Sequence, residues 1–584
     1  MGAHLLTEHF HLLAAAPNGV QKLRELILNL AVRGKLVPQD PGDEPASELL
    51  KKIAAEKLRL VAEGKIKSPS IPLFQRGKTA ASVPPFEKGG LGGISEDEKP
   101  YALPQGWEWV RFGEIAQHNS GKTLDKGRNT GKLRAYITTS NLYWGRFELE
   151  NVRQMPIRDE ELEKCNATKN DLLICEGGEA GRAAVWNLDS DICIQNHIHR
   201  ARFFQAINPY FAYRFFDKLN TTGEINQYRQ GVGISNMSGK VLASIIFPLP
   251  PLVEQSRIVA KVDELMQLCD QLEAQQTSQG AAHERLVAAL LGTLTQSADA
   301  QAFAENWARL AAHFDLLFDT PESIAKLKQT LLQLAVQGKL VPQDPSDEPA
   351  GELLKKIAAE KARLVAGGKI RKDKPLAGIG EDEKPFVVPR CWEWSRLRLL
   401  VFALGDGLHG TPAYVGGTNY YFINGNNLAD GKIVIKPHTK TVSFDEMQKH
   451  KKPMSLNTVL VSINGTLGSM AFYNNEQVIL GKSACYFDLS EYVNKHFVRL
   501  VIESQYFIDY ALQSASGTTI KNLSLKSMNE LPVPLPPFAE QSRIVAKVDE
   551  MMAVCDALSE KLTQARQLSQ KLMQAITQSS SAEA

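Results

Sequence analysis

The sequence has few cysteines and no cysteine pair: seven Cys residues are scattered along 584 residues, with no CxxC motif. An odd number of dispersed thiols is typical of a reducing compartment and excludes a disulfide-stabilised secreted scaffold. No apolar run approaches the ~18 residues that cross a bilayer. The N-terminal stretch lacks the basic start and apolar core of a secretion signal. We therefore expect a cytoplasmic protein.

The chain also lacks an excess of either charge, since its formal net charge is only +2. The net charge of the chain therefore does not indicate a type of partner. A surface that binds nucleic acid would have to be a local cluster of basic residues. The composition, with 43% hydrophobic and 23% charged residues, is ordinary for a globular protein. At roughly 150 residues per domain, this length predicts three or four structural units.

The chain contains one unit written twice. Three segments recur in the same order: 23–66 at 327–370, EDEKP of 96–100 at 381–385, and EQSRIVAKVDE of 254–264 at 540–550. Within the first, GKLVPQDP of 34–41 is identical at 338–345. The first copy carries extra residues within 67–95, where Pro-containing turns and a GG-x-GG run predict a flexible, exposed insertion. The second copy lacks them, so the shared function should not need them.

The well-matched ends of each copy have helical periodicity. Apolar residues recur at steps of three and four at Val20, Leu23, Ile27 and Leu30, and at Ile324, Leu327, Leu331 and Leu334. After each Pro-Pro pair follows an a/d heptad seam: Ile258, Val262, Leu265, Cys269 and Leu272 in one copy, and Ile544, Val548, Met551, Cys555 and Leu558 in the other. A seam present in both copies predicts that the two helices pack on each other.

The middles of the copies, about 101–247 and 386–533, contain short β-favouring runs broken by Gly, Asn and Pro. They stay colinear at Asn141-Leu142 and Asn427-Leu428, at Gly145 and Gly431, and at Gly181 and Gly468, but diverge elsewhere. One scaffold therefore presents two different surfaces. We predict an α+β fold with two mixed α/β domains, separated by long helices that pair as an antiparallel coiled coil, with an internal pseudo-twofold duplication.

The predicted boundaries follow from these patterns. They are an N-terminal helical region at 1–66, the insertion at 67–95, a first variable domain at 96–250, a central helical region at 251–380, a second variable domain at 381–536 and a C-terminal helix at 537–584.

Two segments match nucleotide-binding patterns but lack the required context. Ala116–Thr123 fits a loose phosphate-loop pattern, yet the glycine-containing LDKGRNTGK follows it where a helix is required. Gly405–Gly410 fits GxGxxG, but Thr411-Pro412 prevents the helix that a dinucleotide fold needs. The two segments occupy nearly the same place in their copies, and neither copy shows the other's motif.

Two further sets have catalytic or metal-binding residue types. Asn208-Pro209-Tyr210 partly fits an adenine-methyltransferase loop, but one proline is missing, and we interpret Asn208 as a helix N-cap. Cys193, His197 and His199 have no second ligand cluster nearby, and the alternation around Cys193 predicts an inward strand position. With no nuclease constellation either, we expect a binding protein and not an enzyme.

Basic residues gather in each variable middle among Gly and aromatic residues, a pattern that suits phosphate contacts. The candidates in the first copy are Lys122, Lys126, Arg128, Lys132, Arg134, Tyr143, Trp144 and Arg146, followed by Arg200, Arg202 and Arg229. Those in the second copy are Lys432, Lys436, Lys440, Lys449, Lys451 and Lys452, followed by Lys521 and Asn522. Most charge runs are only solvated loops, but one basic cluster in each variable middle favours DNA.

These features resemble the specificity (S) subunits of type I restriction–modification enzymes. The resemblance rests on FPLPPLVEQSRIVAKVDELM at 247–266 and VPLPPFAEQSRIVAKVDEMM at 533–552, with DLLICEGGEAG at 171–181, TVLVSINGTLG at 458–468, GVGISNMS at 231–238 and SGTTIKNLS at 516–524. It covers essentially the whole chain except the insertion. DNA contacts vary between members, so no individual contact is transferred.

The resemblance implies a non-catalytic subunit that reads a bipartite, asymmetric site on double-stranded DNA. Its partners would be two adenine methyltransferase (modification) subunits and two ATP-dependent motor-nuclease (restriction) subunits. S-adenosylmethionine, ATP and Mg²⁺ would be bound by those partners, and this chain would need no cofactor.

A geometric hypothesis follows from the helices themselves. About 24 helical residues at ~1.5 Å each would make a rod of ~36 Å, close to one DNA turn. Two alternatives remain open. A nucleotide- or S-adenosylmethionine-dependent DNA-modifying enzyme would bind its cofactor as the purified chain, and a non-DNA coiled-coil scaffold would be indifferent to DNA competitors.

Overall fold

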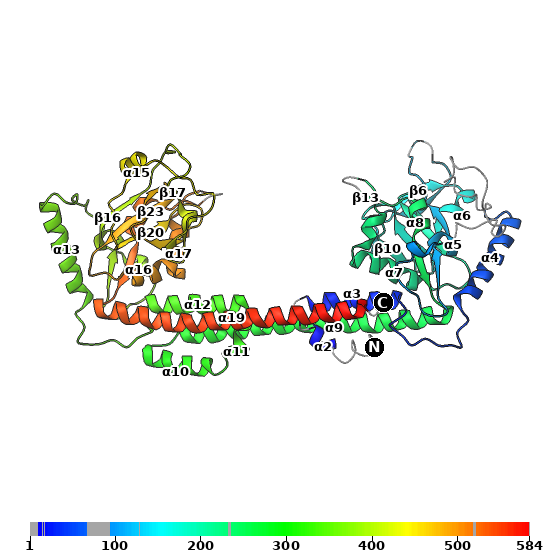
Figure 1. The fold of residues 1–584 in the computed structure, drawn as a ribbon, viewed down its shortest axis with the longest axis horizontal. Coiled ribbons are helices and arrows are strands. Elements are labelled where there is room, and N and C mark those ends of the chain that lie inside the picture. The colour runs from blue at the N-terminus through cyan, green and yellow to red at the C-terminus, as the bar shows by residue number, and fades with distance from the viewer. Residues whose placement is uncertain are drawn as a thin grey trace. The chain divides into compact units, whose positions relative to one another are not determined.

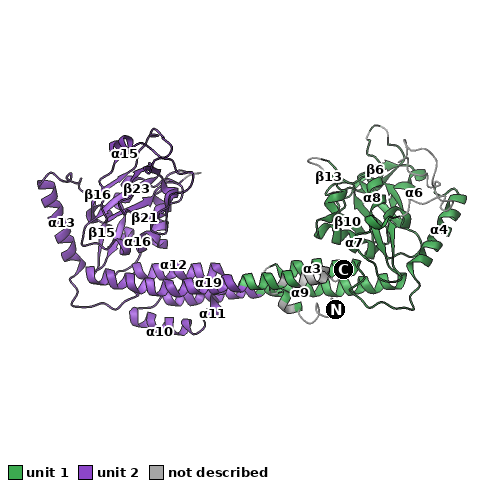
Figure 2. Cartoon of the chain, in the orientation of Figure 1, with its two compact units in different colours: residues 1–278, 566–584 green, residues 279–565 purple. Residues whose placement is uncertain are grey.

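The computed structural model describes residues 10–14, 16, 18–66, 94–125, 127, 129–231, 235–517 and 521–582. The chain divides into two compact units, residues 1–278 with 566–584 and residues 279–565 (Figure 2). The boundary at 278/279 falls inside the range expected to form a central helical region. Nearly all of the predicted insertion, together with Lys126 and Arg128, lies outside the described residues.

The helical frame of unit 1 consists of α3 (Gly19–Val32) packed on the first part of α9 (Leu252–Thr295), with the short α2 (Phe10–Ala14) beside α3. The four predicted apolar positions of α3 are all buried, and the first heptad seam lies in the same core. Arg24 of α3 forms ion pairs with Asp270 and Glu273 of α9 at 2.5 and 3.0 Å. The periodicity of both helices is therefore confirmed.

Unit 2 repeats this frame with α12 (Pro321–Val336) packed on α19 (Phe538–Ala582). Lys328 and Asp556 form an ion pair at 2.6 Å, at the positions equivalent to Arg24 and Asp270. The second part of α9 belongs to the same core through Val287, Leu291 and Leu294. Inside unit 2 the two long helices lie side by side and run in opposite directions (Figure 1), as predicted. Helices α10 (Ala300–Ala311) and α11 (Phe314–Leu317) complete the frame.

The predicted partner of the first seam needs correction, and that of the second needs an addition. The residues from Ile258 to Leu272 are buried with α3, whereas those from Ile544 to Leu558 are buried with α12 and the second part of α9. A heptad pattern marks a buried stripe but does not name the surface that covers it. The helix length was also underestimated, since α9 has 44 residues and not about 24.

The first variable domain belongs to unit 1 and carries two four-stranded sheets. One has the order β10 (Ala183–Val185), β8 (Leu172–Cys175), β12 (Ile198–Phe203), β2 (Ala116–Ser120), and is entirely antiparallel. The other has the order β6 (Arg153–Ile157), β3 (Lys132–Ile137), β11 (Ile192–Ile194), β7 (Asn166–Ala167), with β3 and β11 parallel. Helix α7 (Pro209–Thr221) packs between the first sheet and α3.

Smaller elements complete this domain. They are η1 (Glu96–Glu98), β1 (Glu108–Arg111) paired with β14 (Ile246–Leu249), α5 (Phe112–Ile115), β4 (Leu142–Tyr143) paired with β5 (Arg146–Phe147), η2 (Asp159–Glu161), α6 (Leu162–Cys165), β9 (Gly177–Gly178) paired with β13 (Ser235–Asn236), η3 (Glu224–Tyr228) and α8 (Gly239–Ser244). Helix α4 (Ala46–Ala62) flanks the domain (Figure 1).

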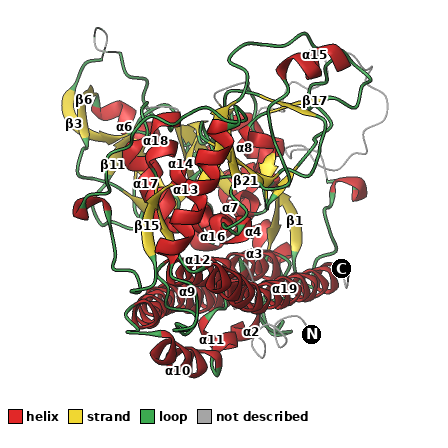
Figure 3. Ribbon diagram, turned by 90° about the vertical axis from the view of Figure 1, so that its left-hand side faces the viewer, coloured by secondary structure: helices red, strands yellow, loops and turns green. Residues whose placement is uncertain are grey.

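The second variable domain, in unit 2, is built on the same plan. Its main sheet has the antiparallel order β16 (Val401–Asp406), β23 (Ala484–Leu489), β20 (Thr458–Ser462), β21 (Met470–Phe472). Strands β17 (Tyr421–Ile423) and β22 (Val478–Leu480) form a parallel pair. Helices α16 (Lys495–Glu503) and α17 (Gln505–Ser514) pack on α12, as Figure 3 shows for α16.

The remaining elements of this unit are short, apart from one longer helix. They are α13 (Ala350–Ala366), η4 (Glu381–Glu383), β15 (Glu393–Arg396) paired with β24 (Pro532–Leu535), α14 (Leu397–Leu400), η5 (Gly425–Asn427), β18 (Leu428–Ala429) paired with β19 (Lys432–Ile433), α15 (Phe444–His450) and α18 (Leu525–Glu530).

The positions that stay identical in the two middles have structural roles. Asn141 donates through Nδ2 to the carbonyl of Glu148 at 2.9 Å, and Asn427 donates in the same way to Val434 at 2.9 Å. Gly181 and Gly468 have φ of +90° and +85°. A Cβ at Gly181 would also lie 2.3 Å from Cδ1 of Ile225, so glycine is required there.

Candidate nucleic-acid interface

A buried carboxylate joins the first variable domain to the helix that follows it. Glu254, 1% exposed at the start of α9, accepts hydrogen bonds from Trp107 Nε1 at 2.9 Å and from Gln39 Nε2 at 2.7 Å. One turn further along, Arg257 forms an ion pair with Asp43 at 2.5 Å. Burial raises the pKa of Glu254 above its ordinary value.

The next residue of the motif, Gln255, holds two more backbone groups. Its Nε2 donates to the carbonyl of Pro250 at 2.9 Å, and its Oε1 accepts from the backbone N–H of Asn208 at 2.9 Å. The Asn208 side chain in turn accepts from the N–H of Tyr210 and caps α7, which confirms the N-cap interpretation.

Unit 2 contains the same junction except for the tryptophan hydrogen bond, since Trp392 Nε1 makes none with the described residues. Gln343 donates to Glu540 at 2.7 Å, and Arg543 pairs with Asp347 at 2.6 Å. Gln541 donates to Pro536 at 3.1 Å and accepts from the N–H of Asn494 at 2.7 Å. The two strings that are nearly identical in both copies, GKLVPQDP with its flank and EQSRIVAKVDE, therefore bind each other within each unit.

The basic cluster of the first domain is largely paired with carboxylates. Lys122 binds Glu161, while Lys132 and Arg134 bind Asp159 at 2.9 and 2.5 Å. These partners hold the pKa of Asp159 below its ordinary value and lower that of Glu161 to about 2. The acidic residues come from η2, which the sequence did not single out because it lies more than 20 positions away from all three basic residues.

The predicted aromatic positions lie around two arginines. The guanidinium of Arg146 lies 4.9 Å from the ring centre of Tyr143, and that of Arg182 lies 5.2 Å from it. Trp144 donates through Nε1 to Glu179 at 2.8 Å. Sequence reasoning missed Arg182, although it directly follows Gly181, one of the glycines common to both copies.

Three arginines of the first domain make internal contacts. Arg200 has no exposed surface, donates to the carbonyl of Asn166, and has a pKa lowered to about 10 by burial. The prediction that Arg200 contacts DNA is therefore wrong. Arg202 binds the buried carboxylate of Asp171 at 2.7 and 2.8 Å, and Arg229 donates to the carbonyl of Ala180 at 2.8 Å. Contacts of these two with DNA stay predictions.

The lysines of the second domain are more accessible. The exposed ones are Lys432, Lys440, Lys449, Lys451 and Lys521. Lys436 donates to the carbonyl of Asn426 at 2.7 Å, and Lys452 lies 6.0 Å from the ring centre of Tyr486. Asn522 accepts from Asn464 Nδ2 at 3.2 Å. Their contacts with DNA remain untested.

The nucleotide-like motifs have the context expected for structural segments. Ala116–Ser120 is strand β2, and Lys122 continues in extended chain. The described residues up to 131 do not form the helix that a phosphate loop requires. Gly405–Gly410 begins within β16 and continues into a loop. Cys193 is buried in β11, as its alternation predicted. Among the described residues, no group of three or more His, Cys, Asp or Glu side chains could hold a metal ion.

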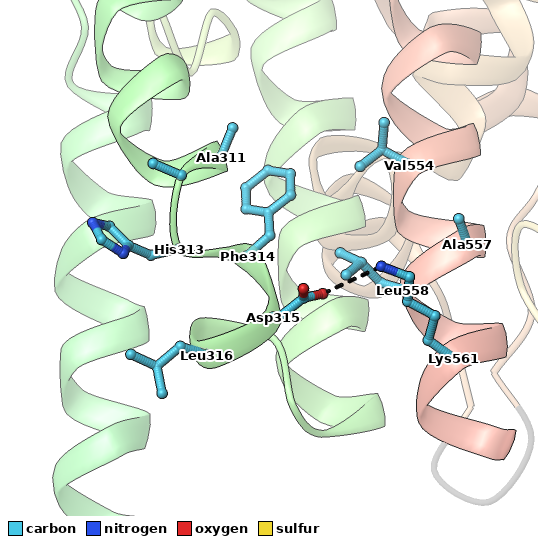
Figure 4. A pocket seen from close by; sticks show the side chains of 10 residues that line it. Ala311, His313, Phe314, Asp315, Leu316, Val554, Ala557, Leu558 and Lys561 are labelled. Carbon is cyan, nitrogen blue, oxygen red and sulfur yellow. Dashed lines mark ion pairs between the residues drawn. The ribbon is translucent and has the colours of Figure 1, made fainter. Parts of the chain in front are cut away.

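Unit 2 contains a hollow of about 400 Å³ (Figure 4). It lies between the α10–α11 connection and α19, and Asp315 and Lys561 form an ion pair across it at 3.7 Å. Its other lining groups include Phe314, Val554 and Leu558.

Across the described part of the chain, no helix is long and apolar enough to span a membrane.

Comparison with known proteins identifies the family. The model of the type I restriction modification DNA specificity domain matches residues 104–279 and 413–565, one region in each unit. The chain belongs to this family of specificity subunits. It is 36% identical to the EcoAI specificity subunit of Escherichia coli over 571 residues, covering 96% of this chain and 93% of the relative. It is 34% identical to the EcoEI specificity subunit of the same organism, with the same coverage of both chains.

Solved structures of the family are more distant in sequence. The HsdS subunit of Thermoanaerobacter tengcongensis is 18% identical, with a TM-score of 0.40, and the match covers 83% of this chain and 98% of that one.

Proposed function

We propose that this specificity subunit reads a bipartite, asymmetric site on double-stranded DNA, with one half-site for each variable domain. The observation that carries the proposal is the pattern of identity between the two copies. The glutamine–glutamate and arginine–aspartate contacts of the junction around Glu254 and Glu540 are the same in both, while the surfaces around β3 and β17 differ. A common frame that holds two different reading surfaces suits a site with two unlike halves.

In this proposal the chain supplies recognition and its partners supply chemistry. Two adenine methyltransferase subunits would bind, one for each copy of the frame, and two ATP-dependent motor-nuclease subunits would add restriction. S-adenosylmethionine, ATP and Mg²⁺ would be held by those subunits. The local structure around Lys122 and Gly405 supports this division, because the described residues that follow each segment do not form a helix that could bind a nucleotide phosphate.

A domain exchange tests the modular reading. Residues 101–247 are replaced by the corresponding domain of a relative with a different methylation motif. The incoming domain supplies its own counterparts of β1 and Trp107, while Gln39 and Glu254 stay in place. We expect sequencing of methylated DNA to show one half-site changed and the other retained. The reciprocal exchange of 386–533 is the matched control and should change the other half. A change in both halves after a single exchange would contradict one reader per half-site.

A further inference from the structure

Each variable domain contains a small subdomain in which two parallel strands carry a helical segment. In unit 1, β3 pairs with β11, with Tyr136 opposite Cys193, and η2 and α6 follow β6. In unit 2, β17 pairs with β22, with Phe422 opposite Ile479, and α15 occupies the corresponding place. Figure 1 shows α15 on the side of unit 2 remote from α12.

The charges of these two subdomains are arranged differently. In unit 1 the strand is basic and the helical segment is acidic, so Lys132 and Arg134 are both paired with Asp159. In unit 2, neutral groups stand at the equivalent positions, which lie just before β17. Thr418 donates through its hydroxyl to the carbonyl of Val442 at 2.7 Å, and the ring of Tyr420 lies 5.5 Å from that of Phe444.

Lysines instead surround the helical segment of unit 2. Lys440 precedes α15, Lys449 lies in its last turn and Lys451 follows it, and all three side chains are exposed. None of the three has an ion-pair partner among the described residues, whereas Glu446 of α15 is paired with His450 at 3.4 Å. The ammonium groups of this lysine segment, 440–451, are therefore available to an anionic partner.

We infer that the lysine segment of unit 2 makes sequence-independent contacts with the DNA backbone, and that in unit 1 Asp159 restrains the basic strand β3, and Glu161 restrains Lys122, from doing so. This rests on the proposed function. Phosphates attract free ammonium groups directly and release counterions on binding. To reach Lys132 or Arg134, they must first compete with Asp159, the carboxylate that both cations share. The non-specific part of the affinity is thus unequally divided between the two domains.

The test measures binding of the assembled modification complex to a duplex that lacks the recognition site, across a range of salt concentrations. For the variant K440Q/K449Q/K451Q, we expect the slope of log affinity against log salt to fall by up to about three, roughly 0.9 for each lost phosphate contact. K132Q/R134Q should leave that slope unchanged. D159N/E161Q should raise the affinity several-fold, on the order of threefold for each exposed ion pair removed. K355Q, an exposed lysine of α13, is the control and should have no effect.

Two results would overturn the inference. One is an unchanged salt slope in K440Q/K449Q/K451Q, and the other is an equal loss of slope in K132Q/R134Q. Both results count only if the complex that contains the unsubstituted chain, the parent complex, binds the duplex. If the parent complex binds neither this duplex nor one that carries its site at low salt, the proposed function itself fails. All three lysines are exposed, and unchanged hydrogen exchange in β17 and β22 would verify folding.

Discussion

Replacing Glu254 by alanine should loosen the first variable domain from α9. The carboxylate is almost fully buried and accepts hydrogen bonds from Trp107 Nε1 and Gln39 Nε2. Each buried donor left without an acceptor costs about 1–3 kcal/mol. Removing a carboxylate whose pKa is raised by burial returns part of this cost. We therefore expect a net loss of roughly 2–4 kcal/mol in the local stability of the junction.

Hydrogen exchange measured by mass spectrometry reports this loss at the right place, because it resolves local opening in a chain of several units. The amides of β1, paired with β14 beside Trp107, should exchange about 100-fold faster in Glu254→Ala, since 1.4 kcal/mol corresponds to a factor of ten. Glu540→Ala is the matched variant and should affect β15 and β24 while leaving β1 unchanged. Unchanged protection of the β1 amides in Glu254→Ala would refute the role of Glu254 in joining the first variable domain to α9.

Three further outcomes are expected. Leu327→Ala should destabilise unit 2 by about 2–5 kcal/mol in denaturant titration, because the side chain is fully buried between helices; Leu58→Ala, at a position 73% exposed, should stay within about 0.5 kcal/mol. Asn208→Ala should cost about 0.5–2 kcal/mol and speed exchange in the first turn of α7, with Tyr210→Phe as a neighbouring control. The Lys122–Glu161 pair should weaken in acid. Because the pKa of Glu161 in the folded chain is about 2, below its ordinary value of 4.5, its contribution is complete above pH 4.5 and lost toward pH 2. Comparing acid unfolding with that of Glu161→Gln checks this, and identical profiles would argue against it.

The sequence predicted the helical frame well because its signal is local. Apolar steps of three and four mark a buried face, and Leu23, Ile27, Leu327 and Leu331 are indeed buried. The partner of the first seam was predicted wrongly, because α3, which covers it, lies more than 200 residues away in the chain. The ion pair between Arg24 and Asp270 that joins them has no local signature.

The candidate interface was predictable only in part, for the same reason. Residue type does not separate an exposed arginine from one such as Arg200, which lies in the central part of a buried strand. The pairing of Lys122 with Glu161 depends on how β2 and η2 meet in the folded domain. By contrast, the cap at Asn208 was predicted correctly, because an N-cap followed by proline is defined within three residues.

The duplication also explains why the motif strings are nearly identical. Gln39 and Asp43 bind Glu254 and Arg257, and the equivalent four residues bind in the second unit. A change at one of these positions would leave a buried polar group without its partner. The reading surfaces have no such internal partner in common, so they could diverge.

The most direct test of the central claim is a genome-wide map of N6-methyladenine. It compares cells that carry this chain and its companion methyltransferase with cells that lack only this chain. The account predicts a split, asymmetric motif with one methylated adenine on each strand, present in the first cells and absent from the second. An identical map in both, in cells where the companion methyltransferase is expressed and active, would contradict it.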